Sequence, residues 1–164
     1  MLSYPKGALV TDATAHKGSV SALLVGGYED ERLLVREVFR QCGWRLFEAP
    51  DRRRAAQCLK RHPVQVVIAK SDLPGGSWQK MLEHLRRLAR PPLLIVTSRT
   101  ADEHLWAEVL NIGGYDVLAQ PFERDEMVRV VASACRHFGH LPALAEAPAD
   151  APAGTPAELA TSVA

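Results

Sequence analysis

The stretch Val64-Gln65-Val66-Val67-Ile68-Ala69 is almost wholly apolar and rich in β-branched residues. Such a run is typical of a strand that is buried on both faces of a parallel sheet. Other strand-like runs flank it along the chain, at 21–25, 44–49, 93–97 and 116–119. Helical patterns alternate with these runs, at 30–42, 51–61, 77–88, 102–111 and 123–137.

Strand and helix therefore alternate five times along the chain. Short connections between buried parallel strands require right-handed crossovers, with helices on both faces of the sheet. The sequence predicts an α/β fold, a flavodoxin-like (βα)5 doubly wound parallel sheet with strand order 2-1-3-4-5. In this architecture ligands bind beyond the carboxyl ends of the strands.

The alternating pattern covers residues 19–140 and predicts one domain there. Residues 1–18 show no periodicity and are predicted to form a flexible N-terminal segment. Residues 141–164 contain nine Ala, four Pro, three acidic residues and no Lys or Arg. Few large apolar side chains are present to bury, so a disordered tail is predicted.

The composition excludes several classes of function. Lys and Arg number 20 and Asp and Glu number 19, a balance that argues against binding nucleic acid through bulk charge. No apolar run is long enough for a membrane span or a signal peptide, so we expect a cytoplasmic location and no membrane partner. Cys42, Cys58 and Cys135 are far apart, which favours reduced thiols over a disulfide or a zinc site. We expect neither a metal nor another cofactor.

Five landmarks stand in order along the folded part. They are Leu23-Leu24-Val25 followed by Arg32, Leu73-Pro74-Gly75, Leu94-Ile95-Val96-Thr97-Ser98, Gly113-Gly114-Tyr115-Asp116 and Gln120-Pro121-Phe122. Together, and at these spacings, they resemble the receiver domain of two-component response regulators, over residues 19–138. The resemblance also implies a cis peptide bond between Gln120 and Pro121.

The resemblance implies phosphoryl transfer from a histidine kinase to an aspartate. The family's site has an acidic pair after the first strand that holds Mg²⁺, an aspartate ending the third, a hydroxyl ending the fourth, and a lysine after the fifth. Mg²⁺ and the lysine neutralise charge on the transferred group. The matching positions in this chain are Gly26, Gly27, Lys70, Thr97 and Gln120.

Of these positions only Thr97 keeps the family's chemistry. An ammonium cannot form an acyl phosphate and glycine supplies no carboxylate, so we predict a degenerate pseudo-receiver without a phosphoacceptor aspartate. It would be no enzyme and would act in phosphorelay signalling through phosphorylation-independent protein–protein interaction. A shifted alignment that recruits Asp72, with Glu29 and Asp30 as the acidic pair, is an alternative that breaks the Leu73-Pro74-Gly75 register.

The altered site also suggests a sensing role. Lys70 places a positive charge there, and the backbone N–H groups of Gly26 and Gly27 near a helix start would favour an anion. One hypothesis is a small-anion or metabolite site formed by Lys70, Thr97, Gly26 and Gly27. The other is that Lys70 pairs with Glu29 or Asp30 and fills the site.

The resemblance implies a protein partner (a kinase, a regulator or a second copy of the chain). In the family, the face formed by the fourth helix, the fifth strand and the fifth helix docks partners. The helical pattern predicts that Leu105, Val109 and Leu110 face the core, leaving Trp106 and Glu108 near this face, although Trp106 also suits the core. Val117 takes the place of the family's aromatic residue on the fifth strand. We expect a homodimer through this face and no nucleic-acid partner.

Overall fold

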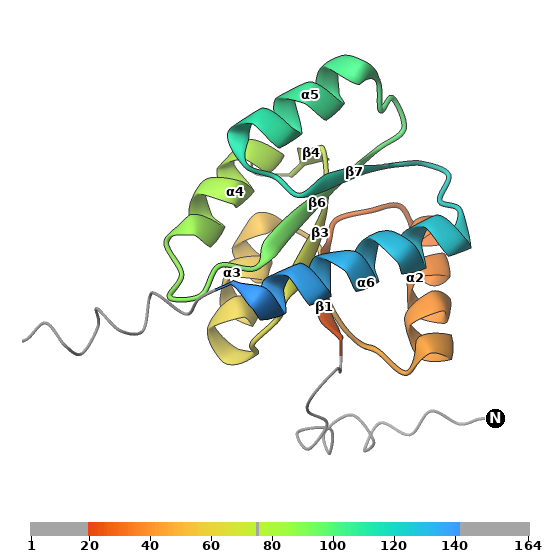
Figure 1. Cartoon of the computed structure of the whole chain (residues 1–164), viewed down its shortest axis with the longest axis horizontal. Helices are drawn as coiled ribbons and strands as arrows, with labels where there is room; N and C mark the ends of the chain where they lie inside the picture. Colours follow the sequence, from red (N-terminus) through yellow and green to blue (C-terminus); the bar gives the residue numbers. More distant parts are fainter. Residues whose placement is uncertain (1–19, 75, 142–164) are drawn as a thin grey trace, which may run out of the picture.

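A five-stranded parallel sheet forms the centre of the protein in the computed structural model, which describes residues 20–74 and 76–141 (Figure 1). Its strands are β1 (Ser21–Val25), β2 (Arg45–Ala49), β3 (Val66–Lys70), β6 (Leu93–Ser98) and β7 (Asp116–Ala119). They lie in the order β2-β1-β3-β6-β7, with parallel pairing throughout. The predicted flavodoxin-like fold and its strand order are confirmed. The predicted N-terminal segment 1–18 and, except for Leu141, the predicted tail 141–164 lie outside the described residues.

Helices cover both faces of the sheet. Those of the described residues are α2 (Glu29–Cys42), α3 (Arg52–Arg61), α4 (Trp78–Arg86), α5 (Glu103–Ile112) and α6 (Arg124–His140). One core lies between the sheet and α3, α4 and α5, and the other between the sheet and α2 and α6 (Figure 1). In β3, Val67 and Ala69 belong to the first core, and Val66 and Ile68 belong to the second. Burial on both faces explains why this strand carries no polar alternation.

Two helices begin where an aspartate accepts a backbone hydrogen bond. Asp51 accepts from the Arg54 N–H at 2.8 Å, and Asp102 accepts from the Leu105 N–H at 2.9 Å. Each carboxylate satisfies a donor that the first helical turn leaves free. Ser77 precedes α4 as predicted, but its side chain makes no capping hydrogen bond.

A short antiparallel hairpin follows β3, where the sequence predicts only a turn. It pairs β4 (Asp72–Leu73) with β5 (Gly76–Ser77). Strands of two residues are too short to produce a recognisable periodicity. The hairpin nevertheless buries Leu73 against the core.

The helices present slightly different faces to the core than the sequence suggests. Leu33 of α2 is exposed, whereas Glu31 and Val35 are buried. Leu33 lies two residues from both of them, about 200° around the helix, and so faces solvent. Leu110 of α5 is also exposed rather than buried. Among the described residues, no helix is long and apolar enough to cross a membrane.

Candidate functional site

The positions singled out in the sequence gather at the carboxyl edge of the sheet. Lys70, the last residue of β3, is the register partner of Thr97 in β6. The Gln120 N–H donates to the Ser98 carbonyl at 3.0 Å, which places Gln120 beside the end of β6. A Cβ at Gly26 would lie 3.7 Å from the Lys70 Cβ. The Gln120–Pro121 peptide is cis, so this prediction is confirmed.

The loop after β1 depends on two glycines in left-handed backbone conformation. Gly26 has φ 77° and Gly27 has φ 104°, a region that side chains with a Cβ rarely adopt. A Cβ at Gly26 would also lie 2.9 Å from the Leu73 Cδ2. The Gly26 N–H donates to the Ala49 carbonyl at 2.9 Å. This N–H is therefore already used, contrary to the expectation that it would be open to an anion.

Lys70 contacts residues other than those expected to pair with it. Its Nζ lies 3.9 Å from the centroid of the Tyr28 ring and 3.7 Å from the Asp72 Oδ1. The predicted pairing with Glu29 or Asp30 is wrong, since the carboxylate that pairs with Lys70 is Asp72. Asp72 lies two residues beyond Lys70, so both side chains project to the same side of an extended chain.

The charge of Lys70 is stabilised at this position. Burial lowers the pKa of the Lys70 ammonium, but its contact with Tyr28 and the nearby carboxylates of Asp72 and Glu31 outweigh burial and raise the pKa above its ordinary value. The lysine therefore stays protonated at neutral pH.

Three residues that the sequence analysis did not identify complete the site. The Glu31 Oε2 accepts from the Tyr28 backbone N–H at 2.9 Å, which places this carboxylate beside the Gly27 loop. The Arg99 Nε lies 3.5 Å from the Glu31 Oε1, and the Arg99 guanidinium carbon lies 3.9 Å from the Tyr28 ring centroid. Glu31 is the third residue of α2, where a glutamate typically reaches back to the residue before the helix. The position of Glu31 in the first turn of the helix was the sequence signal that could have identified it.

Thr97 and Gln120 are bound to each other. The Gln120 Nε2 donates to the Thr97 Oγ1 at 3.2 Å, and both side chains are buried. The second Thr97 neighbour is the backbone of Ser71, whose N–H donates to the Thr97 carbonyl at 2.8 Å. The Thr97 hydroxyl, at the family's position beside the acceptor, is thus hydrogen-bonded to the side-chain amide of Gln120, which follows β7.

The predicted docking residues divide into exposed and buried ones. Trp106 is 45% exposed, whereas the Glu108 Oε2 accepts a 2.6 Å hydrogen bond from Gln79 of α4. Val117 is only 6% exposed because β7 directs it into the core beside Val109, so it contributes no docking surface. The prediction for Val117 is therefore corrected.

Comparison with known proteins identifies the family. The model of the response regulator receiver domain matches residues 23–132. The chain belongs to this family. It is therefore a response-regulator receiver domain of two-component systems.

Individual relatives agree with this assignment. The chain is 32% identical over 118 residues to an uncharacterized transcriptional regulatory protein of Bacillus subtilis (strain 168), YrkP, a match that covers 70% of this chain and 49% of that protein. The chain thus spans about half the length of this relative.

Solved structures share the fold of the receiver. The signal receiver domain of an HD domain-containing protein from Pseudomonas fluorescens Pf-5 has a TM-score of 0.68 at 22% identity, over 75% of this chain and 99% of that one. The beryllofluoride-activated NtrC4 receiver domain dimer has a TM-score of 0.67 at 16% identity, over 72% of this chain and 98% of that one. At these identities the likeness concerns the fold alone.

Proposed function

We propose that this receiver works in two-component signalling without aspartyl phosphorylation, as a module that binds other proteins. The observation that carries the proposal is the residue ending β3. The family's acceptor position holds Lys70, whose ammonium contacts Tyr28 and Asp72. An amine cannot form the acyl phosphate on which the family's signalling depends.

The residues at the site do not fit the family's Mg²⁺. A hard divalent cation takes oxygen ligands, with carboxylates foremost. Gly26 and Gly27 have no side chains, and the Lys70 ammonium adds positive charge. The nearby Glu31 carboxylate already accepts from the Tyr28 N–H and faces Arg99. We therefore derive no phosphoryl-transfer step at this site.

The test is chemical phosphorylation of the full chain. Incubation with acetyl phosphate and Mg²⁺, followed by intact-mass measurement, should add no phosphoryl group, and beryllofluoride with Mg²⁺ should leave the amide spectrum unchanged. A receiver that keeps the family's aspartate serves as the positive control. Asp72→Asn is the matched variant: labelling of wild type that disappears in this variant would establish Asp72 as the acceptor and refute the proposal.

The docking surface in this proposal is the exposed face of α5, β7 and α6, and the partner is a second copy of the chain. On α5, Trp106 and Leu110 are large apolar residues one helical turn apart, and both are more than a third exposed. Contiguous exposed apolar side chains, aromatic ones above all, mark interaction sites. The NtrC4 receiver, which has the same fold, is described as a dimer.

Solution mass tests this surface. Sedimentation velocity of the full chain should show a dimer that Trp106→Glu converts to a monomer. Leu33→Glu is the matched control, because Leu33 is also apolar and exposed but lies on α2. A monomeric wild type at high concentration, or equal loss of the dimer in both variants, would contradict the docking surface.

A further inference from the structure

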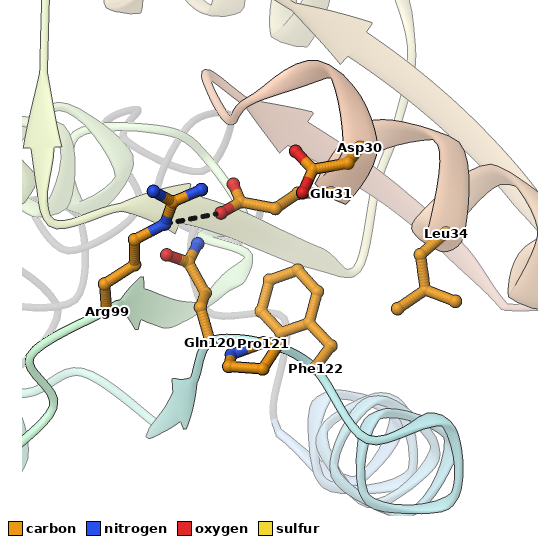
Figure 2. Close-up of a pocket in the computed structure, with 7 residues that line it drawn as sticks. All are labelled: Asp30, Glu31, Leu34, Arg99, Gln120, Pro121 and Phe122. Atoms are coloured by element: carbon orange, nitrogen blue, oxygen red, sulfur yellow. Dashed lines mark ion pairs between the residues drawn. The ribbon is translucent and has the colours of Figure 1, made fainter.

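A pocket of about 270 Å³ opens between the first turn of α2, Arg99 and the segment that joins β7 to α6 (Figure 2). Asp30, Glu31, Arg99 and Gln120 form its polar lining. Figure 2 shows the Glu31 and Gln120 side chains reaching from opposite walls toward Arg99. The pocket is separate from the apolar α5 surface to which the proposed function assigns docking.

Two buried oxygen atoms in this pocket lack hydrogen-bond donors. Glu31 and Gln120 are each 7% exposed. Within the part of the chain that the structure describes, the Glu31 Oε1 and the Gln120 Oε1 have no hydrogen-bond partner. The Arg99 Nε is 3.5 Å from the Glu31 Oε1, an ion-pair distance beyond that of a good hydrogen bond. A buried acceptor without a donor costs free energy, so the pocket favours a ligand that donates.

The charge of the lining favours a positively charged donor. Asp30 and Glu31 carry two negative charges against the single positive charge of Arg99. An ammonium group has three N–H donors and no acceptor, so it can donate to more than one oxygen. An anion would place more acceptors against acceptors that already lack donors.

The apolar residues of the pocket indicate what the rest of the ligand is. Leu34, Pro121 and Phe122 line the pocket beside the polar groups, so the ligand needs an apolar part (Figure 2). The pocket is smaller than the roughly 300–1,000 Å³ typical of sites for drug-sized ligands. A molecule with one short hydrocarbon group matches this volume.

We propose that this pocket binds the ammonium group of a small organic amine between Glu31 and Gln120, with its hydrocarbon part on Leu34 and Phe122. The chemistry is shared by two sources, a free amine and an α-amino acid. Arg99 distinguishes them, because its exposed guanidinium lies beside the ammonium position and can pair with the carboxylate of an amino acid. Binding in this pocket requires neither phosphorylation nor the α5 docking surface.

The experiment titrates three probes that share an isobutyl group into the ¹⁵N-labelled full chain. Isoamylamine carries only the ammonium, L-leucine carries ammonium and carboxylate, and isocaproate carries only the carboxylate. We expect isoamylamine or leucine to shift the amide signals of Glu31, Gln120 and Phe122, and isocaproate to leave them unchanged. If leucine binds more tightly than isoamylamine and Arg99→Met abolishes this difference, the ligand is an amino acid. If isoamylamine binds more tightly than leucine, the ligand is a free amine.

Variants test the two oxygen atoms separately. Glu31→Gln keeps the acceptor for the Tyr28 N–H but removes the charge, and Gln120→Met removes the amide oxygen. Each should weaken binding about tenfold or more, as expected when a charged donor loses its partner. Glu103→Gln and Gln57→Met, at exposed positions of α5 and α3, are the matched controls and should bind like wild type.

Three results would overturn the proposal. They are the absence of shifts with all three probes at millimolar concentration, shifts of equal size with isocaproate, and unchanged affinity in Glu31→Gln. Mg²⁺ is titrated in parallel, and shifts of these amides with Mg²⁺ but with neither amine would replace the amine by a metal ion. The amide spectrum of each variant also reports whether it is folded.

Discussion

The Lys70 ammonium lies 3.9 Å from the centroid of the Tyr28 ring and so joins the carboxyl end of β3 to the residue before α2. A cation over an aromatic ring contributes about 0.5–1 kcal/mol at exposed sites and about 2 kcal/mol where it is desolvated. Lys70 is mostly buried, so the contact lies between these limits. The second partner, Asp72, is exposed and adds little.

Lys70→Met should therefore reduce the free energy of unfolding by about 1 kcal/mol, because the methionine keeps the apolar stem but loses the charge. Urea unfolding measures this loss. Lys80→Met, at an exposed position of α4, should change stability by less than about 0.5 kcal/mol. A double-mutant cycle with Tyr28→Leu isolates the contact, and additive effects of the two substitutions would show that it contributes nothing.

Gly26→Ala should destabilise the fold. The alanine would have to adopt φ near 77° and its Cβ would lie 2.9 Å from the Leu73 Cδ2, so we expect a loss of about 1–3 kcal/mol. The control is Gly139→Ala in α6, where a Cβ meets no atom within 4 Å. That substitution should stabilise the helix by about 0.5–1 kcal/mol. Equal effects of the two substitutions in urea unfolding would argue against strain at Gly26.

His84 should make the protein less stable in acid. Burial, followed by the positive charges of Arg52, Arg87 and Lys60, lowers the pKa of His84 below its ordinary value of 6.5. The unfolded chain therefore binds this proton more readily than the folded one. Its contribution to stability is complete above pH 6.5 and is lost as the pH falls through the lowered pKa.

Urea unfolding at neutral and acidic pH measures this dependence. His84→Gln should show a smaller loss of stability on acidification than wild type, since its side chain does not titrate. His104→Gln, at an exposed position of α5, should keep the full loss. An identical acid dependence in His84→Gln and wild type would exclude His84 as its source. The structure half-buries the His84 side chain.

Cys135 should resist alkylation in the folded protein. Burial raises the pKa of its thiol to about 11, so at pH 8 roughly one thiol in a thousand is the reactive thiolate. In a Cys42→Ser, Cys58→Ser variant, iodoacetamide should leave the native mass unchanged and add one group after unfolding in urea. Rapid labelling of the native variant would show that Cys135 is accessible.

The repeating pattern of the sequence was sufficient to predict the fold, because burial on both faces leaves a strong signal in β3 and its neighbours. Helix starts at Asp51 and Asp102 were also predictable, since the capping side chain is local in sequence. The spacing of apolar residues shows that a helix has an apolar face. It does not show which of those residues point most directly at the sheet. Leu33 and Leu110 are exposed because packing against the sheet selects neighbouring positions.

The candidate site was predictable only in part. Strand order brings Gly26, Lys70, Thr97 and Gln120 to one edge, and this follows from topology alone. The residues that contact Lys70 do not follow from topology. Its contacts with Tyr28 and Asp72 depend on how these side chains are oriented in the folded protein. The same holds for the approach of Arg99 to Glu31, which joins the loop after β6 to the first turn of α2.

The left-handed conformation of Gly26 and Gly27 has a consequence for protein design. A carboxylate introduced after β1 by substitution alone would strain the fold, since both positions have a backbone conformation that favours glycine. Gly26 is also held by Ala49 at the end of β2 and bordered by Leu73 of the hairpin. A phosphorylatable version of this domain would therefore have to be engineered at the level of the backbone, with β2 and the hairpin redesigned together with the loop.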